Sequence, residues 1–132
     1  MKTYFAIVEK DQNSAFGISF PDLPSVFSAA DEEADILNNA IEAISLWAED
    51  EALPDASSFK NILKQNEVKE ALASGGFLVR VPLIENDTRT VRANVTFEAG
   101  MLRAIDVEAK RRGLTRASFL ANAAKKEIVQ AG

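Results

Sequence analysis

The C-terminal third of the chain contains a segment in which apolar and polar residues strictly alternate. Residues 90–97 read Thr-Val-Arg-Ala-Asn-Val-Thr-Phe. Because successive side chains of a β-strand point to opposite faces, this order predicts a strand whose polar face carries Arg92, Asn94 and Thr96. A short strand is not stable without a neighbour, so the pattern also predicts that a second chain supplies the paired strand.

The apolar spacing changes to that of helices immediately after this segment. Residues 98–112 and the residues from 115 onward each place their apolar side chains along one side of a helix. Gly113 suits the left-handed position that ends many helices, and Thr115 suits the N-cap of the next helix. The apolar positions are Met101, Leu102, Ile105 and Ala109 in the first helix, and Phe119, Leu120, Ala123, Ala124 and Ile128 in the second.

The first half of the chain begins with patterns typical of strands. Residues 3–10, 15–20 and 25–28 are rich in β-branched and aromatic residues. Between them, residues 11–14 and 21–24 consist mainly of turn formers, including two prolines that cannot donate a ladder hydrogen bond. We therefore expect three antiparallel strands in this part of the chain.

Helical spacing follows, and then one more strand. Asp31 suits the N-cap of a helix that ends near Asp50, and a weaker helical pattern covers residues 58–73. Residues 77–83 again favour a strand. This order predicts an α+β domain whose antiparallel sheet has helices on one face. The apolar stripe of the longer helix consists of Leu37, Ala40, Ile41, Ile44, Trp47 and Ala48.

The net charge of −5 is unevenly distributed along the chain. Residues 1–82 contain 14 acidic and 6 basic residues, whereas residues 83–132 contain 6 acidic and 9 basic residues. Residues 83–89 are mostly polar and lack periodicity, so we place a linker there, between a domain over residues 1–82 and a domain over residues 90–132. An acidic domain joined to a basic one is typical of a protein with a DNA-binding tail.

The composition narrows the possible chemistry. The 132 residues include no cysteine and no histidine. Disulfides, thiolate metal sites, most zinc sites and histidine-based catalytic triads are therefore excluded. The N-terminus lacks the apolar core of a signal peptide, and no apolar run approaches the roughly 18 residues of a membrane span. We expect a cytoplasmic protein without a cofactor.

Two stretches of the sequence, one between Phe5 and Trp47 and the other between Arg92 and Arg116, together resemble the HicB antitoxins of bacterial toxin–antitoxin modules. The second stretch is similar to the ribbon-helix-helix variety of that family, and roughly residues 50–75 have no match. Ser25 and Ala30 stand where family members typically have glycine, so the two turns there are expected to differ locally. The first stretch consists of Phe5–Asp11, Phe20–Pro24, Phe27, Asp31, Leu37, Asn39, Ala40, Ala43 and Trp47, and the second of Arg92–Phe97 and Gly113–Arg116.

The resemblance implies a fold and a function for each half. The N-terminal domain would be a partial ribonuclease-H-like antiparallel sheet with helices and without nuclease activity. It would block a small HicA toxin, a double-stranded-RNA-binding-like protein that cleaves mRNA. The C-terminal ribbon-helix-helix domain would form a homodimer and bind the operator of its own operon. The chain would then be both antitoxin and autorepressor, and whether its dimers join into tetramers stays open.

The polar face of the predicted strand is suited to reading DNA bases. In a ribbon of two such strands, Arg92 would address guanine, Asn94 adenine, and Thr96 a thymine methyl group or a hydrogen-bond donor. The first turn of the last helix would contact a phosphate through backbone N–H groups and a positive charge. The candidate phosphate-binding residues are Thr115, Arg116 and Ser118.

The candidate toxin-binding residues are acidic. An acidic surface attracts a basic RNA-binding partner and covers its RNA-binding face. The first candidates are Glu9, Asp11 and Asp22, which stand near the ends of predicted strands. Each of the three is equally well explained as ordinary solubilising charge.

Other functions remain open at this point. A ribonuclease-H-like sheet with paired carboxylates would be a metal-dependent nuclease, which added Mg²⁺ or Mn²⁺ would reveal. However, no acid stands in the middle of a predicted strand, so we interpret these residues as a solvated rim and a helix cap, not as catalytic or metal-binding groups. Alternatively, the chain would be a repressor with a ligand-sensing N-terminal domain, or a structural dimer. The acids considered are Glu9, Asp11, Asp22 and Asp31.

Overall fold

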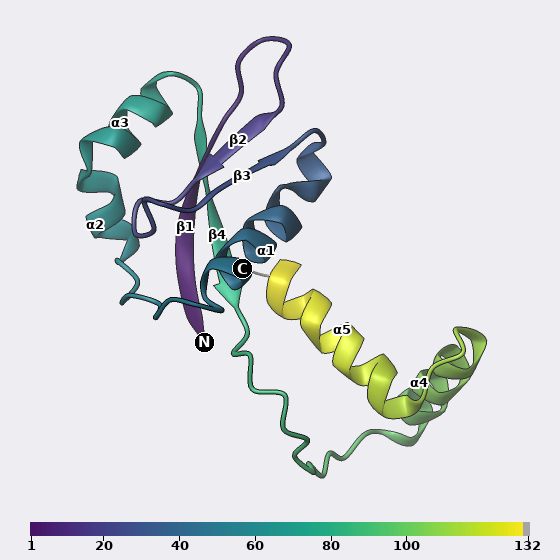
Figure 1. The fold of residues 1–132 in the computed structure, drawn as a ribbon. Coiled ribbons are helices and arrows are strands. Elements are labelled where there is room, and N and C mark those ends of the chain that lie inside the picture. The colour runs from purple at the N-terminus through teal and green to yellow at the C-terminus, as the bar shows by residue number, and fades with distance from the viewer. Residues whose placement is uncertain (131–132) are drawn as a thin grey trace. The chain divides into compact units, whose positions relative to one another are not determined.

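The computed structural model describes residues 1–130 of the chain, which divide into two compact units. The first unit comprises residues 1–85 and the second residues 86–130. The first unit contains a sheet and three α-helices, and the second contains two α-helices. Figure 1 shows the course of the chain through these elements. The unit boundary falls inside the predicted linker at residues 83–89.

The first unit is built on an antiparallel sheet of four strands in the order β3-β2-β1-β4. In β1, Ile7 pairs with Ser19 of β2 on one side and with Leu78 of β4 on the other. The prediction of strands in these places is confirmed, although the third begins two residues later than expected. The strands are β1 (Lys2–Glu9), β2 (Phe16–Ser19), β3 (Phe27–Ala30) and β4 (Phe77–Leu83).

Two consecutive turns account for the late start of β3. The N–H of Leu23 donates to the carbonyl of Phe20, and the N–H of Val26 donates to the carbonyl of Leu23. These bonds hold the backbone in turns through Val26, so that the extended conformation begins at Phe27. The turn segment that contains the two prolines therefore extends two residues beyond Pro24.

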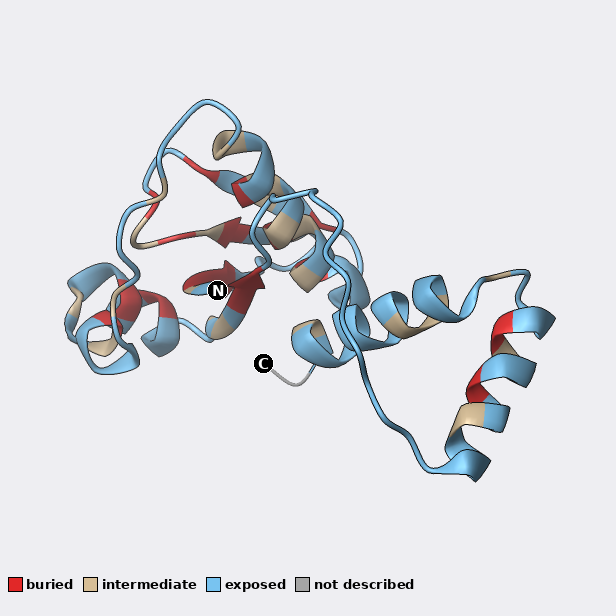
Figure 2. Cartoon of the chain, turned by 90° about the horizontal axis from the view of Figure 1, so that it is seen from below, coloured by how far each residue is buried: buried red, intermediate tan, exposed pale blue. Residues whose placement is uncertain are grey.

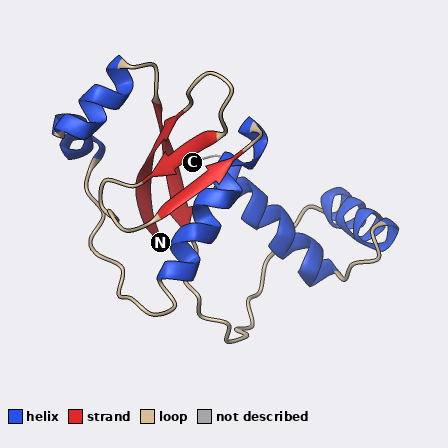
Figure 3. Cartoon of the chain, turned by 45° about the horizontal axis from the view of Figure 1, so that its top comes forward, coloured by secondary structure: helices blue, strands red, loops and turns tan. Residues whose placement is uncertain are grey.

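Helices cover both faces of the sheet, and the prediction of helices on one face is wrong. Helix α1 (Ile36–Trp47) packs on one face, whereas α2 (Phe59–Lys64) and α3 (Asn66–Ala73) lie on the other (Figure 3). The cause is visible in β1, where five consecutive residues, Tyr4 to Val8, are buried. A strand that is apolar at every position needs cover on both sides.

The two faces carry separate cores. The α1 face buries the larger cluster, and the α2–α3 face buries a smaller one over β1 and β4. The larger core consists of Tyr4, Ala6, Val8, Ile18, Phe20, Leu23, Val26, Ala30, Ile36, Ala40, Ile44, Val81 and Leu83. The smaller core consists of Phe5, Ile7, Ile62, Val68 and Ala71.

The helices begin and end differently from the sequence prediction. A 3₁₀ turn, η1 (Glu33–Asp35), precedes α1, and no side-chain hydrogen bond caps either element, so the assignment of Asp31 as an N-cap is wrong. The single helix predicted over residues 58–73 is divided, because Gln65 adopts an extended conformation between α2 and α3. Ser58 caps α2 by accepting a hydrogen bond from the N–H of Asn61 at 3.2 Å.

The second unit consists of α4 (Ala99–Arg111) and α5 (Arg116–Gln130), which confirms the two predicted helices. Residues 90–97 form no strand in this single chain. A strand requires hydrogen bonds from a neighbour, so the predicted ribbon stays a prediction about a dimer. Figure 2 shows how little of this unit is buried: among its described residues, only Ile105 and Ala109 are buried.

Candidate functional site

The segment that precedes α4 exposes both of its faces. Arg92, Asn94 and Thr96 are all exposed, as the predicted base-reading role requires. On the opposite face, Val91 and Val95 have exposed fractions of 79% and 67%. Large apolar side chains at every second position are costly to leave in water, about 1.5–3 kcal/mol for each one that a partner would bury. The segment therefore has an apolar face available for a second chain.

The turn between α4 and α5 has the geometry expected from its sequence. Gly113 has φ +69°, its N–H donates to the carbonyl of Lys110 at 3.0 Å, and the N–H of Leu114 donates to the carbonyl of Ala109 at 2.8 Å. These bonds satisfy carbonyl groups that the end of a helix leaves without partners, and the left-handed conformation favours glycine. The prediction of Gly113 as the residue that ends the helix is confirmed.

Thr115 caps α5, also as predicted. Its Oγ1 accepts a hydrogen bond from the N–H of Ser118 at 3.1 Å and donates to the Ser118 hydroxyl at 3.0 Å. The three predicted phosphate-binding residues, Thr115, Arg116 and Ser118, thus stand together on the first turn of α5. The positive end of the helix dipole lies at the same place, which is the local arrangement that binds phosphate in proteins.

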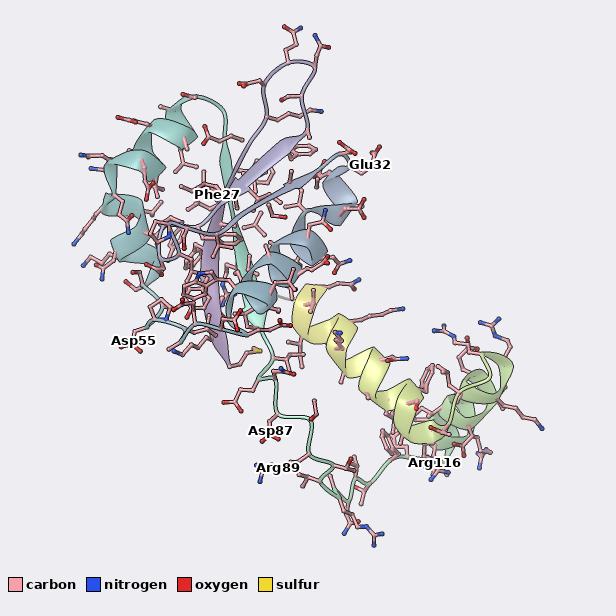
Figure 4. All side chains as sticks on the ribbon, in the orientation of Figure 1. Phe27, Glu32, Asp55, Asp87, Arg89 and Arg116 are labelled. Carbon is pink, nitrogen blue, oxygen red and sulfur yellow. The ribbon has the colours of Figure 1, made fainter. Side chains whose placement is uncertain are left out.

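In this chain the charge of Arg116 is already matched by a carboxylate. Its Nε and Nη2 donate to the two oxygens of Asp106 in α4, each at 2.8 Å. Hydrogen bonding from Arg116 lowers the pKa of Asp106, and the same contact raises the pKa of Arg116. Figure 4 labels Arg116 at the start of α5. Because a carboxylate and a phosphate accept from the guanidinium in the same planar geometry, a phosphate that binds the Nε–Nη2 edge of Arg116 must first replace Asp106.

A second set of ion pairs lies at the end of α4. Arg111 and Arg112 both donate to the carboxylate of Glu108, the latter from Nε at 2.8 Å. Hydrogen bonds from Arg111 first, and from Arg112 second, lower the pKa of Glu108 to about 2. The guanidinium of Arg112 also lies 5.5 Å from the centre of the Phe119 ring, which joins the two helices.

The predicted toxin-binding acids differ in their surroundings. Glu9 and Asp11 are exposed. The two oxygens of Asp22 accept from the backbone N–H of Ser57 at 2.7 Å and from its hydroxyl at 2.6 Å. Asp22 therefore holds the loop that leads to α2. The sequence did not indicate this structural role, because Asp22 and Ser57 are 35 positions apart.

The same loop is held at two further points. The hydroxyl of Tyr4 donates to the carbonyl of Pro54, and Lys2 Nζ donates to the carbonyl of Leu53 at 3.0 Å. Burial, and then the negative charges of Asp22 and Asp55, raise the pKa of Tyr4. The neutral phenol is thus kept as a donor, and the loop is fixed against β1.

A groove that the sequence did not indicate lies between β3 and α1. Its volume is about 480 Å³. Two large apolar side chains stand exposed beside it, Phe27 at 70% and Leu46 at 59%. One signal was present in the sequence: Leu46 is apolar but lies off the buried stripe of its helix. The lining residues are Ser25, Val26, Phe27, Ser28, Asn39, Glu42, Ala43, Leu46 and Trp47.

The described residues contain neither a cluster of metal ligands nor a membrane-spanning helix. Within residues 1–130, no three side chains of the metal-ligating acidic, cysteine or histidine types lie together as a set of ligands. None of the helices in that range combines the length and the apolar character that crossing a membrane requires.

The fold and these surfaces define a two-unit protein with an acidic α+β unit and a basic helical unit that has unpaired apolar surface. Comparison with known proteins identifies the family. A family model described as the HicB-like antitoxin of a bacterial toxin–antitoxin system matches residues 4–124. The chain belongs to this family, which confirms the resemblance found in the sequence.

Individual relatives cover the chain to different extents. An uncharacterized 14.9 kDa protein from the rep-hol intergenic region of Haemophilus phage HP1 is 29% identical over 90% of this chain and 92% of its own. The crystal structure of the Burkholderia pseudomallei antitoxin HicB is 25% identical, covers both chains completely and has a TM-score of 0.52. A structure of a HicA3 and HicB3 toxin–antitoxin complex is 26% identical over 63% of this chain and 99% of that one, with a TM-score of 0.51.

Proposed function

We propose that this antitoxin neutralises a HicA-type mRNA-cleaving toxin with residues 1–85 and represses its own operon with residues 86–132. The proposal includes a partial ribonuclease-H-like fold for the first unit and a ribbon-helix-helix dimer for the second. Both activities act on cytoplasmic targets. Catalysis, metal ions and cofactors have no part in it.

One observation carries the division of labour. The first unit buries two cores of its own, whereas the second leaves Val91 and Val95 exposed beside two helices that bury only Ile105 and Ala109 among the described residues. A unit with so little core requires a partner, and a second copy offers an identical apolar face. Pairing of residues 90–97 would then place Arg92, Asn94 and Thr96 of both chains on the outside of one ribbon.

The toxin is the partner proposed for the first unit. The solved HicA3 and HicB3 toxin–antitoxin complex contains a protein that matches 63% of this chain. A protein that cleaves mRNA needs positive surface to bind its substrate, and residues 1–82 carry 14 acidic against 6 basic residues. Binding through that surface would block access of RNA to the toxin.

Co-expression separates the two activities. Residues 1–85 are expected to restore growth of cells that produce a cognate HicA-type toxin, and residues 86–132 are not. In gel-shift titrations on the DNA upstream of the gene, residues 86–132 are expected to bind and residues 1–85 are not. Rescue by residues 86–132 alone would reverse the assignment. Cleavage of RNA by the full chain on addition of Mg²⁺ would show it to be a nuclease instead.

A further inference from the structure

We propose that the β3–α1 groove, lined by residues 25–28 at the start of the edge strand β3 and by residues of α1 between Asn39 and Trp47, is the surface that binds the RNA-cleaving toxin. The inference rests on the proposed antitoxin function and names its contact surface. The surface differs from the positions that the sequence put forward, since Glu9, Asp11 and Asp22 do not line the groove.

The groove offers an apolar anchor. Phe27 and Leu46 come from different elements and expose 70% and 59% of their surfaces beside the same hollow, with Trp47 half-buried in its wall. Interfaces concentrate their binding energy in a few such side chains, with aromatic residues enriched among them. Neither Phe27 nor Leu46 is needed for the core of the unit, so their exposure calls for a different explanation.

The walls of the groove are fixed before any partner arrives. The side-chain amide of Asn39 in α1 donates to the carbonyl of Ala29 in β3 at 2.9 Å. In return, the hydroxyl of Ser28 donates to the carbonyl of Asn39 at 3.2 Å. These two bonds tie the helix to the edge strand, so that binding costs little ordering of the surface.

Charge selects the partner. Residues 11–59, which form β2, β3, α1 and their connecting loops, contain 11 acidic residues and no basic residue. Residues 60–83, which complete α2 and form α3 and β4, contain 2 acidic and 4 basic residues. The acidic excess of the unit therefore lies entirely on the segment that builds the groove, with Glu42 in its wall. Figure 4 labels Phe27 together with two of these acids, Glu32 and Asp55.

An RNA-binding protein presents the complementary charge. Positive side chains neutralise phosphates along a nucleic acid, so the RNA-binding face of a ribonuclease toxin must be basic. An apolar anchor inside an acidic rim fits such a face: the rim steers the encounter, and the anchor holds the complex. The toxin's RNA-binding face is then covered by the antitoxin.

The other groove of the unit does not fit this partner. It has a volume of about 730 Å³, and Phe5, Phe59 and Arg80 contribute to its lining. It lies by the segment that has more basic than acidic residues, including Lys60 next to Phe59. A basic partner would be repelled there, so this side of the unit supplies the matched controls.

The test compares equivalent substitutions on the two sides of the first unit, each made in the full chain. The probe is a cognate HicA-type toxin, purified as an inactive variant, and binding is measured by surface plasmon resonance. Phe27→Ser and Leu46→Ser are each expected to raise Kd about 10-fold or more. Leu72→Ser on α3, where the leucine is 39% exposed, is expected to change Kd less than 3-fold.

A second pair of substitutions tests the charge. Glu42→Lys is expected to slow association about 10-fold at low salt, whereas Glu70→Lys on α3, with the same change in charge, is expected to slow it less than 3-fold. Urea unfolding of every variant shows whether the fold is kept. Equal effects on the two sides in folded variants would overturn the groove as the docking surface but leave the antitoxin function intact. Failure of the unaltered chain to bind the probe would instead contradict the proposed function.

Discussion

The two units of this chain solve the problem of burying apolar surface in opposite ways. Among the residues described, the first unit contains 18 of the 20 buried apolar residues and wraps a sheet on both faces. The second unit contains the other two, Ile105 and Ala109, and leaves Val91, Val95 and Met101 exposed. The difference shows which half buries its apolar surface within a single chain, and it supports the proposal that the other half pairs with a second copy.

The largest expected effect breaks the second unit alone. Val95→Asp would place a charge without a partner inside the dimer, which costs roughly 3–5 kcal/mol for each buried carboxylate. Sedimentation of the full chain is expected to show a monomer whose first unit remains folded. Thr96→Asp is the control on the opposite face and is expected to remain dimeric while losing DNA binding. A dimeric Val95→Asp variant would show that residues 90–97 do not form the interface.

The reciprocal change breaks the first unit alone. Ile44 is fully buried between α1 and the sheet, and Ile44→Ala is expected to destabilise this unit by about 2–5 kcal/mol. DNA affinity, measured by gel-shift titration, is expected to be unchanged, since none of the substituted atoms belongs to the second unit. Leu46→Ala, on the exposed side of the same helix, is the control for stability. A parallel loss of DNA binding by Ile44→Ala would mean that the units do not act separately.

These contrasts also show where sequence reasoning succeeds. Gly113 and Thr115 were predictable because a helix end and a helix cap depend on residues within four positions of one another. The bounds of β4 were predicted to the residue for a similar reason, since turn formers flank an apolar run. A helix over residues 58–73 was predicted, but its placement on the second face of the sheet was not. The continuous apolar run in β1 indicates burial on both faces without specifying which element covers each one.

The site was less predictable than the fold. The toxin-binding role of Asp22 stays a prediction. Its hydrogen bonds to Ser57 join residues 35 positions apart in the sequence, and no local pattern specifies such a pair. The contact between Asp106 and Arg116 spans 10 residues and depends on how α4 and α5 pack. The groove at Phe27 and Leu46 arises from two elements that meet only in the folded unit. The base-reading roles of Arg92, Asn94 and Thr96 stay predictions.

A medium effect sharpens the role of the exposed segment in DNA recognition. Arg92→Ala is expected to weaken specific DNA binding by about 1–3 kcal/mol for each bidentate arginine–guanine pair that it removes, and a dimer carries two copies. The dimer and its thermal stability are expected to be unchanged, because Arg92 is exposed. Gel-shift titration on the upstream DNA and on a scrambled sequence measures the change in preference. An unaltered preference would show that the strand reads no base with this side chain.

A smaller effect concerns the phosphate site. Asp106→Asn removes the carboxylate that now occupies Arg116, so DNA affinity is expected to rise several-fold and its salt dependence to steepen by about 0.9 per added phosphate contact. Glu108→Gln makes the same change of charge two residues away and serves as the control. An equal gain in DNA affinity in both variants would show that the change in net charge, and not the release of Arg116, causes the effect. Adding Arg116→Ala is expected to cancel the gain of Asp106→Asn.

The smallest effect is a pH dependence confined to the second unit. The folded pKa of Glu108, about 2, lies below that of an ordinary glutamate because Arg111 and Arg112 donate to it. A carboxyl group with a lowered pKa contributes stability above its ordinary pKa and loses it as the pH falls through the folded value. The thermal melting temperature between pH 5 and pH 2 is expected to fall less in Glu108→Gln than in the unaltered chain. Identical slopes would show that the ion pairs add nothing in solution.

The uninterrupted exposure from Ile84 to Met101 has a consequence for the lifetime of the protein. Proteases cut backbone that is exposed and held by few contacts. In the proposed dimer, residues 90–97 would be paired, and residues 84–89 would be the longest part of that stretch outside a strand or a helix. A single cut there would leave the toxin bound to a free first unit and the operator occupied by a bare dimer. After such a cut, synthesis of new antitoxin would stay repressed while the toxin stayed bound to the first unit. Cleavage at this segment would therefore delay the release of the toxin.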